Sequence, residues 1–128
     1  MFKYVRDNGG RYEPVIKTIP ANTAVSYNVG DALIITSGKA AKATGANKPE
    51  YICATTGTGL SEIAVYLVLP GQEYKTTFAA NGTSIAVGAK VTIHTDAAQI
   101  TATTTDGVAE IIEKHGTGAA GTEATVRF

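Results

Sequence analysis

Short runs of alternating apolar and polar residues, punctuated by glycine, recur along the whole chain. Leu33 and Ile35, like Val91 and Ile93, place apolar residues at every second position. This period is typical of strands with one buried face, and the abundant Thr, Val, Ile and Tyr favour strands. We therefore expect an all-β fold with very little helix. The expected strands are 15–19, 33–35, 39–43, 51–55, 63–69, 73–78, 91–93, 99–103, 108–114 and 123–128.

The sequence contains two tandem copies of this pattern. Residues 13–69 and 72–128 align almost end to end at a spacing of about 58 residues, with Pro70-Gly71 as a tight turn between them. Val29-Gly30, for example, recurs as Val87-Gly88. One copy alone would be marginal, since a domain of about 60 residues buries only about 60% of its unfolded surface. We expect a single β domain over 13–128, a small barrel or sandwich of two tandem repeats, preceded by an N-terminal arm over 1–12.

The two copies differ in one direction, because copy one (13–69) is apolar at six positions where copy two (72–128) is polar. The aligned pairs are Ile16/Lys75, Ile34/Thr92, Tyr51/Glu110, Ala54/Glu113, Tyr66/Thr125 and Val68/Arg127. A strand that is apolar on both faces is covered on both faces. The cover could be the N-terminal arm, the other copy or another polypeptide, although scattered apolar residues are also normal on a surface.

We favour a neighbouring subunit as the cover. The candidate subunit interface is Ile16, Ile34, Tyr66 and Val68, and we expect these residues to be more buried than their polar counterparts in copy two.

Charge and composition argue against several classes of function. Eleven basic and eleven acidic residues give a net charge of zero, so nucleic-acid binding has no electrostatic basis. No stretch approaches the roughly 20 apolar residues that span a bilayer. The first residues also lack the apolar segment of a signal peptide. We expect no membrane role and synthesis in a cytoplasm. The single cysteine, Cys53, fits a small core residue.

No set of residues carries a recognisable chemistry. His94 and His115 lack the spacing of metal ligands. The two Gly-Thr-Gly runs precede strands and lack the lysine of a phosphate-binding loop. Asp106, Glu110 and Glu113 fit solvated charges better than an acid–base pair. We therefore expect no catalytic, cofactor-binding or metal-binding residues, no cofactor and no enzymatic activity.

Several strings resemble the head decoration (capsid cement) proteins of tailed bacteriophages. They are 29–33, 38–40 and 42–44 in copy one, and 101–105, 107–110, 116–118 and 126–128 in copy two. The resemblance covers most of residues 13–128. It implies a small β-rich structural protein, often trimeric, that binds and stabilises the surface of an assembled phage or prophage capsid. The major capsid protein would be its partner, and its location would be the virion, after synthesis in the host cytoplasm.

An N-terminal arm frequently makes the capsid contact in that family. By position alone, the candidate capsid contacts are Tyr4, Arg6, Arg11 and Tyr12, because tyrosine and arginine dominate interface hot spots. Two alternatives stay open. One is another phage tail or head-fibre module. The other is a small-molecule or glycan-binding β-barrel, whose sign would be aromatic side chains converging in a cavity, whereas the six tyrosines are scattered along the sequence.

Overall fold

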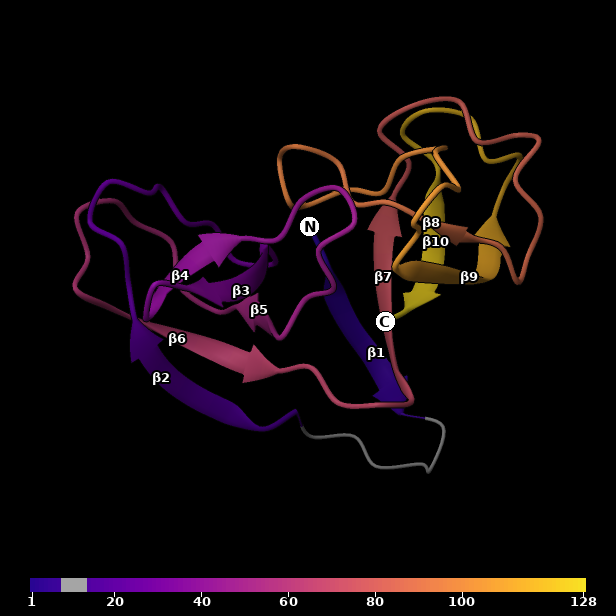
Figure 1. Ribbon diagram of the computed structural model, residues 1–128. Helices are drawn as coiled ribbons and strands as arrows, with labels where there is room; N and C mark the ends of the chain where they lie inside the picture. The colour runs from indigo at the N-terminus through magenta and orange to yellow at the C-terminus, as the bar shows by residue number, and fades with distance from the viewer. Residues whose placement is uncertain (8–13) are drawn as a thin grey trace.

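Ten strands pair into two five-stranded antiparallel sheets, and the part of the chain that the structure describes contains no helix (Figure 1). The computed structural model describes residues 1–7 and 14–128. The first sheet has the order β2 (Ile16–Pro20), β6 (Glu62–Leu67), β5 (Tyr51–Cys53), β3 (Ala32–Thr36), β4 (Lys39–Lys42). The second sheet has the order β1 (Lys3–Asp7), β7 (Gln72–Thr77), β10 (Glu123–Arg127), β9 (Ala109–His115), β8 (Lys90–Val91). The all-β fold class predicted from the sequence is confirmed.

The strands of the two copies follow the same order. In each sheet the first strand of a copy lies beside the last, the last beside the fourth, and the fourth beside the second. The register of the first and last strands also matches, since Thr18 lies opposite Ala64 in the first sheet and Thr77 opposite Glu123 in the second. A duplication predicts such agreement. That the whole copies superpose stays a prediction, which an overlay of 13–69 on 72–128 tests.

The repeated Val-Gly pair forms the same turn in both halves. Gly30 and Gly88 have a φ of 89°, a conformation that glycine adopts without steric cost. The N–H after each glycine donates to the carbonyl before each valine, at 3.1 Å and 3.2 Å, as in a type II turn. The Gly30 N–H then donates to the Cys53 carbonyl at 2.8 Å, and the Gly88 N–H to the Ile111 carbonyl at 2.7 Å.

Two details of the sequence alignment are wrong. The glycine hydrogen bonds match Cys53 with Ile111, so the fourth strands correspond one residue away from the expected alignment. The aligned pairs that this displaces are Tyr51/Glu110 and Ala54/Glu113. The pairing of β9 with β10 contains a bulge between Thr125 and Val126, whereas the pairing of β5 with β6 has none. Residues 99–103 form no named strand, although a bridge joins Ile100 to Ile93.

Two hydrophobic clusters form the core, and the first sheet contributes to both. The central cluster consists of Phe2, Ala32, Ala43, Ile52, Tyr74, Phe78, Val91, Ile93, Ala97, Ile100, Ala109, Ile111, Ala124 and Val126. The lateral cluster consists of Ile19, Ala21, Tyr27, Leu33, Ala40, Cys53, Ile63 and Val65. Adjacent residues of β3 and β5 enter different clusters, because side chains alternate between the faces of a strand. The first sheet is therefore covered on both faces, and the central cluster joins the two halves.

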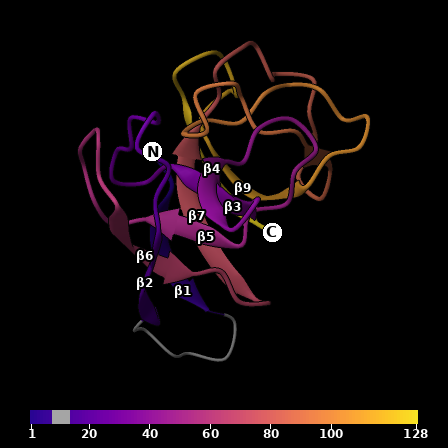
Figure 2. The ribbon, with the colours of Figure 1, turned by 60° about the vertical axis from the view of Figure 1, so that its left-hand side comes forward.

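The N-terminal segment is part of this core and does not project as an arm over its described residues. In Figure 1 β1 lies between the first sheet and β7, with which it pairs, and Figure 2 shows the same ribbon turned by 60°. The Phe2 side chain is 2% exposed, and its ring packs edge-on against Phe128 at 5.3 Å. The Phe2 N–H donates to the Gly30 carbonyl at 2.8 Å. One segment thus extends the second sheet and binds the Val-Gly turn of copy one.

Further backbone hydrogen bonds join the halves directly. The Ala32 N–H donates to the Ala97 carbonyl at 2.7 Å, and Gly45 and Ile93 exchange two bonds of 2.8 Å and 2.9 Å. Hydrogen bonds and a shared apolar cluster therefore hold the halves together.

Candidate functional site

The candidate subunit interface divides into an exposed residue and three partly covered ones. Ile34, Tyr66 and Val68 are half-buried and pack against the central cluster, so this chain itself supplies much of their cover. Ile16 lies on β2, an edge strand of the first sheet, and is 66% exposed. Val15 beside it is also exposed. A neighbouring subunit therefore stays a prediction that rests mainly on Ile16.

The expected order of burial is wrong in the single chain. Thr125 is 3% exposed and Thr92 is 9% exposed, so both are more buried than Tyr66 and Ile34. Their hydroxyls are satisfied locally, since Thr125 pairs with His115 at 2.8 Å and Thr92 with Thr101 at 2.7 Å. A polar residue on an apparently exposed face can thus be covered by polar neighbours. Lys75 is half-buried, in contrast to the exposed Ile16, and Arg127 falls in the same half-buried class as Val68.

The candidate capsid contacts have different surroundings. Tyr4 is half-buried on β1, and its ring lies edge-on to Tyr74 at 5.9 Å. The Arg6 Nε donates to the Glu73 Oε2 at 2.8 Å, while about half of the Arg6 side chain stays exposed. Arg11 and Tyr12 lie outside the described residues. Tyr4 and Arg6 thus form contacts within the second sheet, and their role at a capsid stays a prediction.

Arg6 begins a row of alternating charges across the outer face of the second sheet. In the strand registers Arg6 lies opposite Glu73, Glu73 opposite Arg127, Arg127 opposite Glu110, and Glu110 opposite Lys90. The Arg127 guanidinium donates to the Glu110 carboxylate at 3.1 Å. Opposite charges facing each other across strands stabilise a sheet by roughly 0.2–1 kcal/mol per pair. Glu110, weighed above as a catalytic carboxylate, thus has a structural partner.

A largely apolar cavity of about 360 Å³ lies between β1 and the first sheet. Three of the six tyrosines reach it, namely Tyr4, Tyr66 and Tyr74, each from a different strand. The other lining residues are Met1, Phe2, Lys3, Pro14, Val29, Gly30, Ile52 and Cys53. The sequence missed this convergence because the pairing of β1 with β7 joins distant segments. The alternation of Phe2 and Tyr4 was its one local signal.

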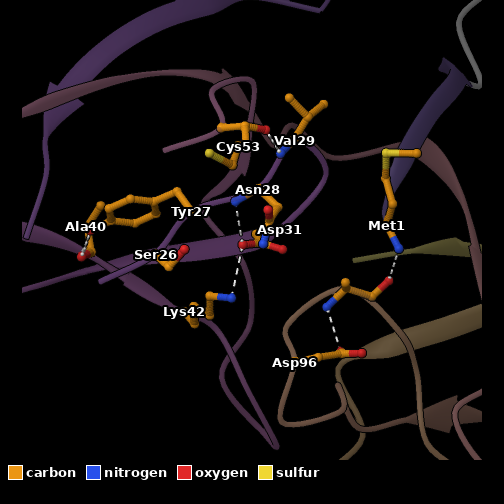
Figure 3. A network of polar contacts seen from close by, with 12 residues as sticks. Met1, Ser26, Tyr27, Asn28, Val29, Asp31, Ala40, Lys42, Cys53 and Asp96 are labelled. Atoms are coloured by element: carbon orange, nitrogen blue, oxygen red, sulfur yellow. Dashed lines mark hydrogen bonds and ion pairs between the residues drawn. The ribbon is translucent and has the colours of Figure 1, made fainter. Parts of the chain in front are cut away.

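An ion pair between a buried aspartate and a partly exposed lysine follows the Val-Gly turn of copy one, whose Val29 and Gly30 line the cavity (Figure 3). Asp31 is 2% exposed, and its Oδ2 lies 3.1 Å from the Lys42 Nζ. The same oxygen accepts the Asn28 N–H at 2.9 Å. These contacts satisfy the carboxylate and hold the Val-Gly turn of copy one in place. The carboxylate has no counterpart in copy two, where Ala89 follows the Val-Gly pair.

Neither histidine joins a set of metal ligands among the described residues. The His94 Nδ1 lies 3.3 Å from the Asp96 Oδ1. Burial is the largest single effect on the pKa of Asp96 and raises it. Hydrogen bonds from the Ala98 N–H, the His94 side chain and the Gln99 N–H outweigh burial, so the pKa lies below its ordinary value of 3.8. The arrangement closes the loop after β8 rather than presenting a ligand set.

Cys53 and Tyr74 are titratable residues that form hydrogen bonds inside the core. Burial raises the pKa of the Cys53 thiol, which donates to the Thr55 carbonyl at 3.1 Å. Burial also raises the pKa of Tyr74, which donates to the Gln72 side chain at 2.6 Å. A neutral, hydrogen-bonded thiol is a poor nucleophile. These groups fill and stabilise the core.

Lys114 on β9 acts as an internal clamp. Its ammonium donates to the carbonyls of Gly82, Thr83 and Ile85 at 3.3, 3.2 and 3.0 Å. These three hydrogen bonds from one charged group hold the loop between β7 and β8 in place.

Comparison with protein-family models, curated proteins and solved structures finds no match for this chain. None of the described residues belongs to a helix that is long and apolar enough to cross a membrane.

Proposed function

We propose that this protein is a structural component of a phage or prophage virion that binds and stabilises the assembled capsid surface. The sequence strings that resemble capsid decoration proteins motivate the proposal. The structural observation that supports it most is the exposed apolar start of the edge strand β2, where Val15 is 51% and Ile16 is 66% exposed. Among the described residues β2 has a strand partner on one side only, and exposed apolar residues on an edge strand are suited to contact with another protein.

The cross-linked architecture fits this role. The two halves share the central cluster, and β1 connects them through both hydrogen bonds and aromatic packing. A rigid body loses little conformational entropy when it docks, so more of each contact's free energy goes into binding. If the protein is a homo-oligomer, with a trimer favoured by the resemblance, several weak contacts on one particle would add in effect. The partner would be the major capsid protein.

The proposal is tested by pelleting the protein with assembled, undecorated capsids of the phage or prophage that encodes it. We expect wild-type protein to sediment with capsids at a fixed ratio to the major capsid protein. Ile16→Lys should lower that ratio at least about tenfold, because it introduces a charge where an apolar contact forms. Val87→Lys is the matched control, since Val87 is also an exposed apolar residue, at 60%, but lies outside β2 in the Val-Gly turn of copy two. Wild-type protein that stays in the supernatant would contradict the proposal.

The oligomer is tested separately by sedimentation velocity over a dilution series. A subunit contact through Ile16 predicts concentration-dependent assembly that Ile16→Lys abolishes. A monomer at every concentration would remove the trimer from the proposal while leaving capsid binding to the pelleting experiment.

A further inference from the structure

We propose that the cavity between β1 and the first sheet is a binding site for a small, flat, largely apolar molecule that carries one polar atom. The cavity has a volume of about 360 Å³. Ligand sites in proteins commonly measure about 300–1,000 Å³ and are lined mainly by apolar and aromatic side chains. The inference does not rest on the capsid-binding proposal, although Tyr4 and Tyr66 line the cavity and are also candidate contacts in that proposal.

The lining of the cavity is largely apolar. Ile52 and Tyr74 line it and are fully buried members of the central cluster. The rings of Tyr4 and Tyr66 provide further aromatic surface. The lining residues include no aspartate or glutamate. This surface favours an aromatic ring over a sugar, because a sugar needs several polar partners for its hydroxyls.

The walls are held in place without a ligand. The Phe2 N–H is bound to the Gly30 carbonyl at 2.8 Å, and β1 is paired with β7. The N-terminal ammonium donates to the Ala98 carbonyl (Figure 3). The Met1 side chain lies against Gly30, where a Cβ would overlap it. Contacts on several sides therefore fix the N-terminal segment that lines one side of the cavity, so binding requires little rearrangement.

Tyr66 supplies a polar group that can orient the ligand, and the exposed Lys3 is a further polar residue of the lining. The Tyr66 hydroxyl has no hydrogen-bond partner among the described residues. It can accept a hydrogen bond from, or donate one to, a single polar atom of the ligand. A bicyclic aromatic with one N–H, of which indole is the simplest example, combines these features.

The test is a titration of the ¹⁵N-labelled full chain with indole, followed by amide chemical shifts. We expect saturable shifts at residues 2–4, 29–30 and 52–53, which border the cavity. The chain offers a matched pair of blocking variants, because Val29 and Val87 occupy the same position of equivalent turns and are 47% and 60% exposed. Only Val29 lines the cavity. Val29→Trp should weaken indole binding at least about tenfold, whereas Val87→Trp should leave it unchanged.

The polar contact is tested with Tyr66→Phe, which removes only the hydroxyl. We expect a loss of about threefold to tenfold for indole, in line with one hydrogen bond, and no loss for toluene. Absence of saturable shifts up to the solubility limit of indole would overturn the proposal. Equal binding to the Val29→Trp and Val87→Trp variants would overturn it as well. Equal indole affinity of Tyr66→Phe and wild type would overturn the assigned role of the hydroxyl.

Discussion

Truncation of Phe2 tests whether the N-terminal segment is part of the core. The side chain is 2% exposed and packs against Phe128. Replacing a buried phenylalanine with alanine costs about 3–5 kcal/mol, and the aromatic pair accounts for about 0.5–1.5 kcal/mol of that. Because β1 is an edge strand that can relax into the space left behind, we expect the lower end of the range. Phe2→Ala should therefore lower the free energy of unfolding by about 3 kcal/mol.

The assay is urea unfolding followed by circular dichroism, with thermal unfolding beside it. A loss of about 3 kcal/mol corresponds to a fall in Tm of about 10 °C for a chain of this size. Val5→Ala on the same strand is the control, since Val5 is 39% exposed and the change should stay within about 0.5 kcal/mol. If Phe2→Ala were as stable as Val5→Ala, the segment would be a dispensable arm and the reasoning would be refuted.

Three further predictions concern single contacts. Lys114→Met removes the ammonium that donates to three carbonyls and should lower the free energy of unfolding, measured in urea, by about 2 kcal/mol. Unchanged stability would show that the loop between β7 and β8 does not depend on these hydrogen bonds. Gly30→Ala and Gly88→Ala face the same φ of 89°, but only the Cβ at Gly30 overlaps Met1. Gly30→Ala should therefore lose at least about 1 kcal/mol more, and equal losses would contradict the position of Met1. The lowered pKa of Asp96 gives stability that is present above about pH 4 and lost as the pH falls through the folded-state pKa. In Asp96→Asn the urea midpoint should accordingly fall less steeply than in wild type as the pH drops below about 4. An equally steep fall would show that other carboxylates cause the loss of stability in acid.

The sequence predicted the elements better than it predicted how they meet. Alternation located nine of the ten strands to within one or two residues, because the period of two is a local property. The pairing of β1 with β7 was missed, since it joins Tyr4 to Tyr74 across much of the chain and no local signal specifies it. The apolar faces of copy one correctly indicated cover on both sides of the first sheet. Their cover inside the chain depends on the packing of the two halves, which hydrophobic periodicity does not encode.

The burial of the candidate interface residues and of their counterparts in copy two was also not predictable from residue type. Thr125 was expected to be exposed because it is polar. Its hydroxyl forms a hydrogen bond with His115, however, and the residue is buried. Ile16 was expected to be covered, yet it lies on an edge strand and is left exposed by the described residues. Burial on a sheet face depends on cross-strand neighbours, and these are set by register rather than by residue type.

The central proposal is that this protein binds the outer surface of an assembled capsid. The most direct measurement is quantitative mass spectrometry of gradient-purified, nuclease-treated particles from the phage or induced prophage that encodes it. The account predicts that the protein migrates with the heads in a constant, stoichiometric ratio to the major capsid protein, and that proteases added to intact particles reach it. Heads that assemble and package DNA without the protein, while it remains in the soluble fractions, would contradict the account.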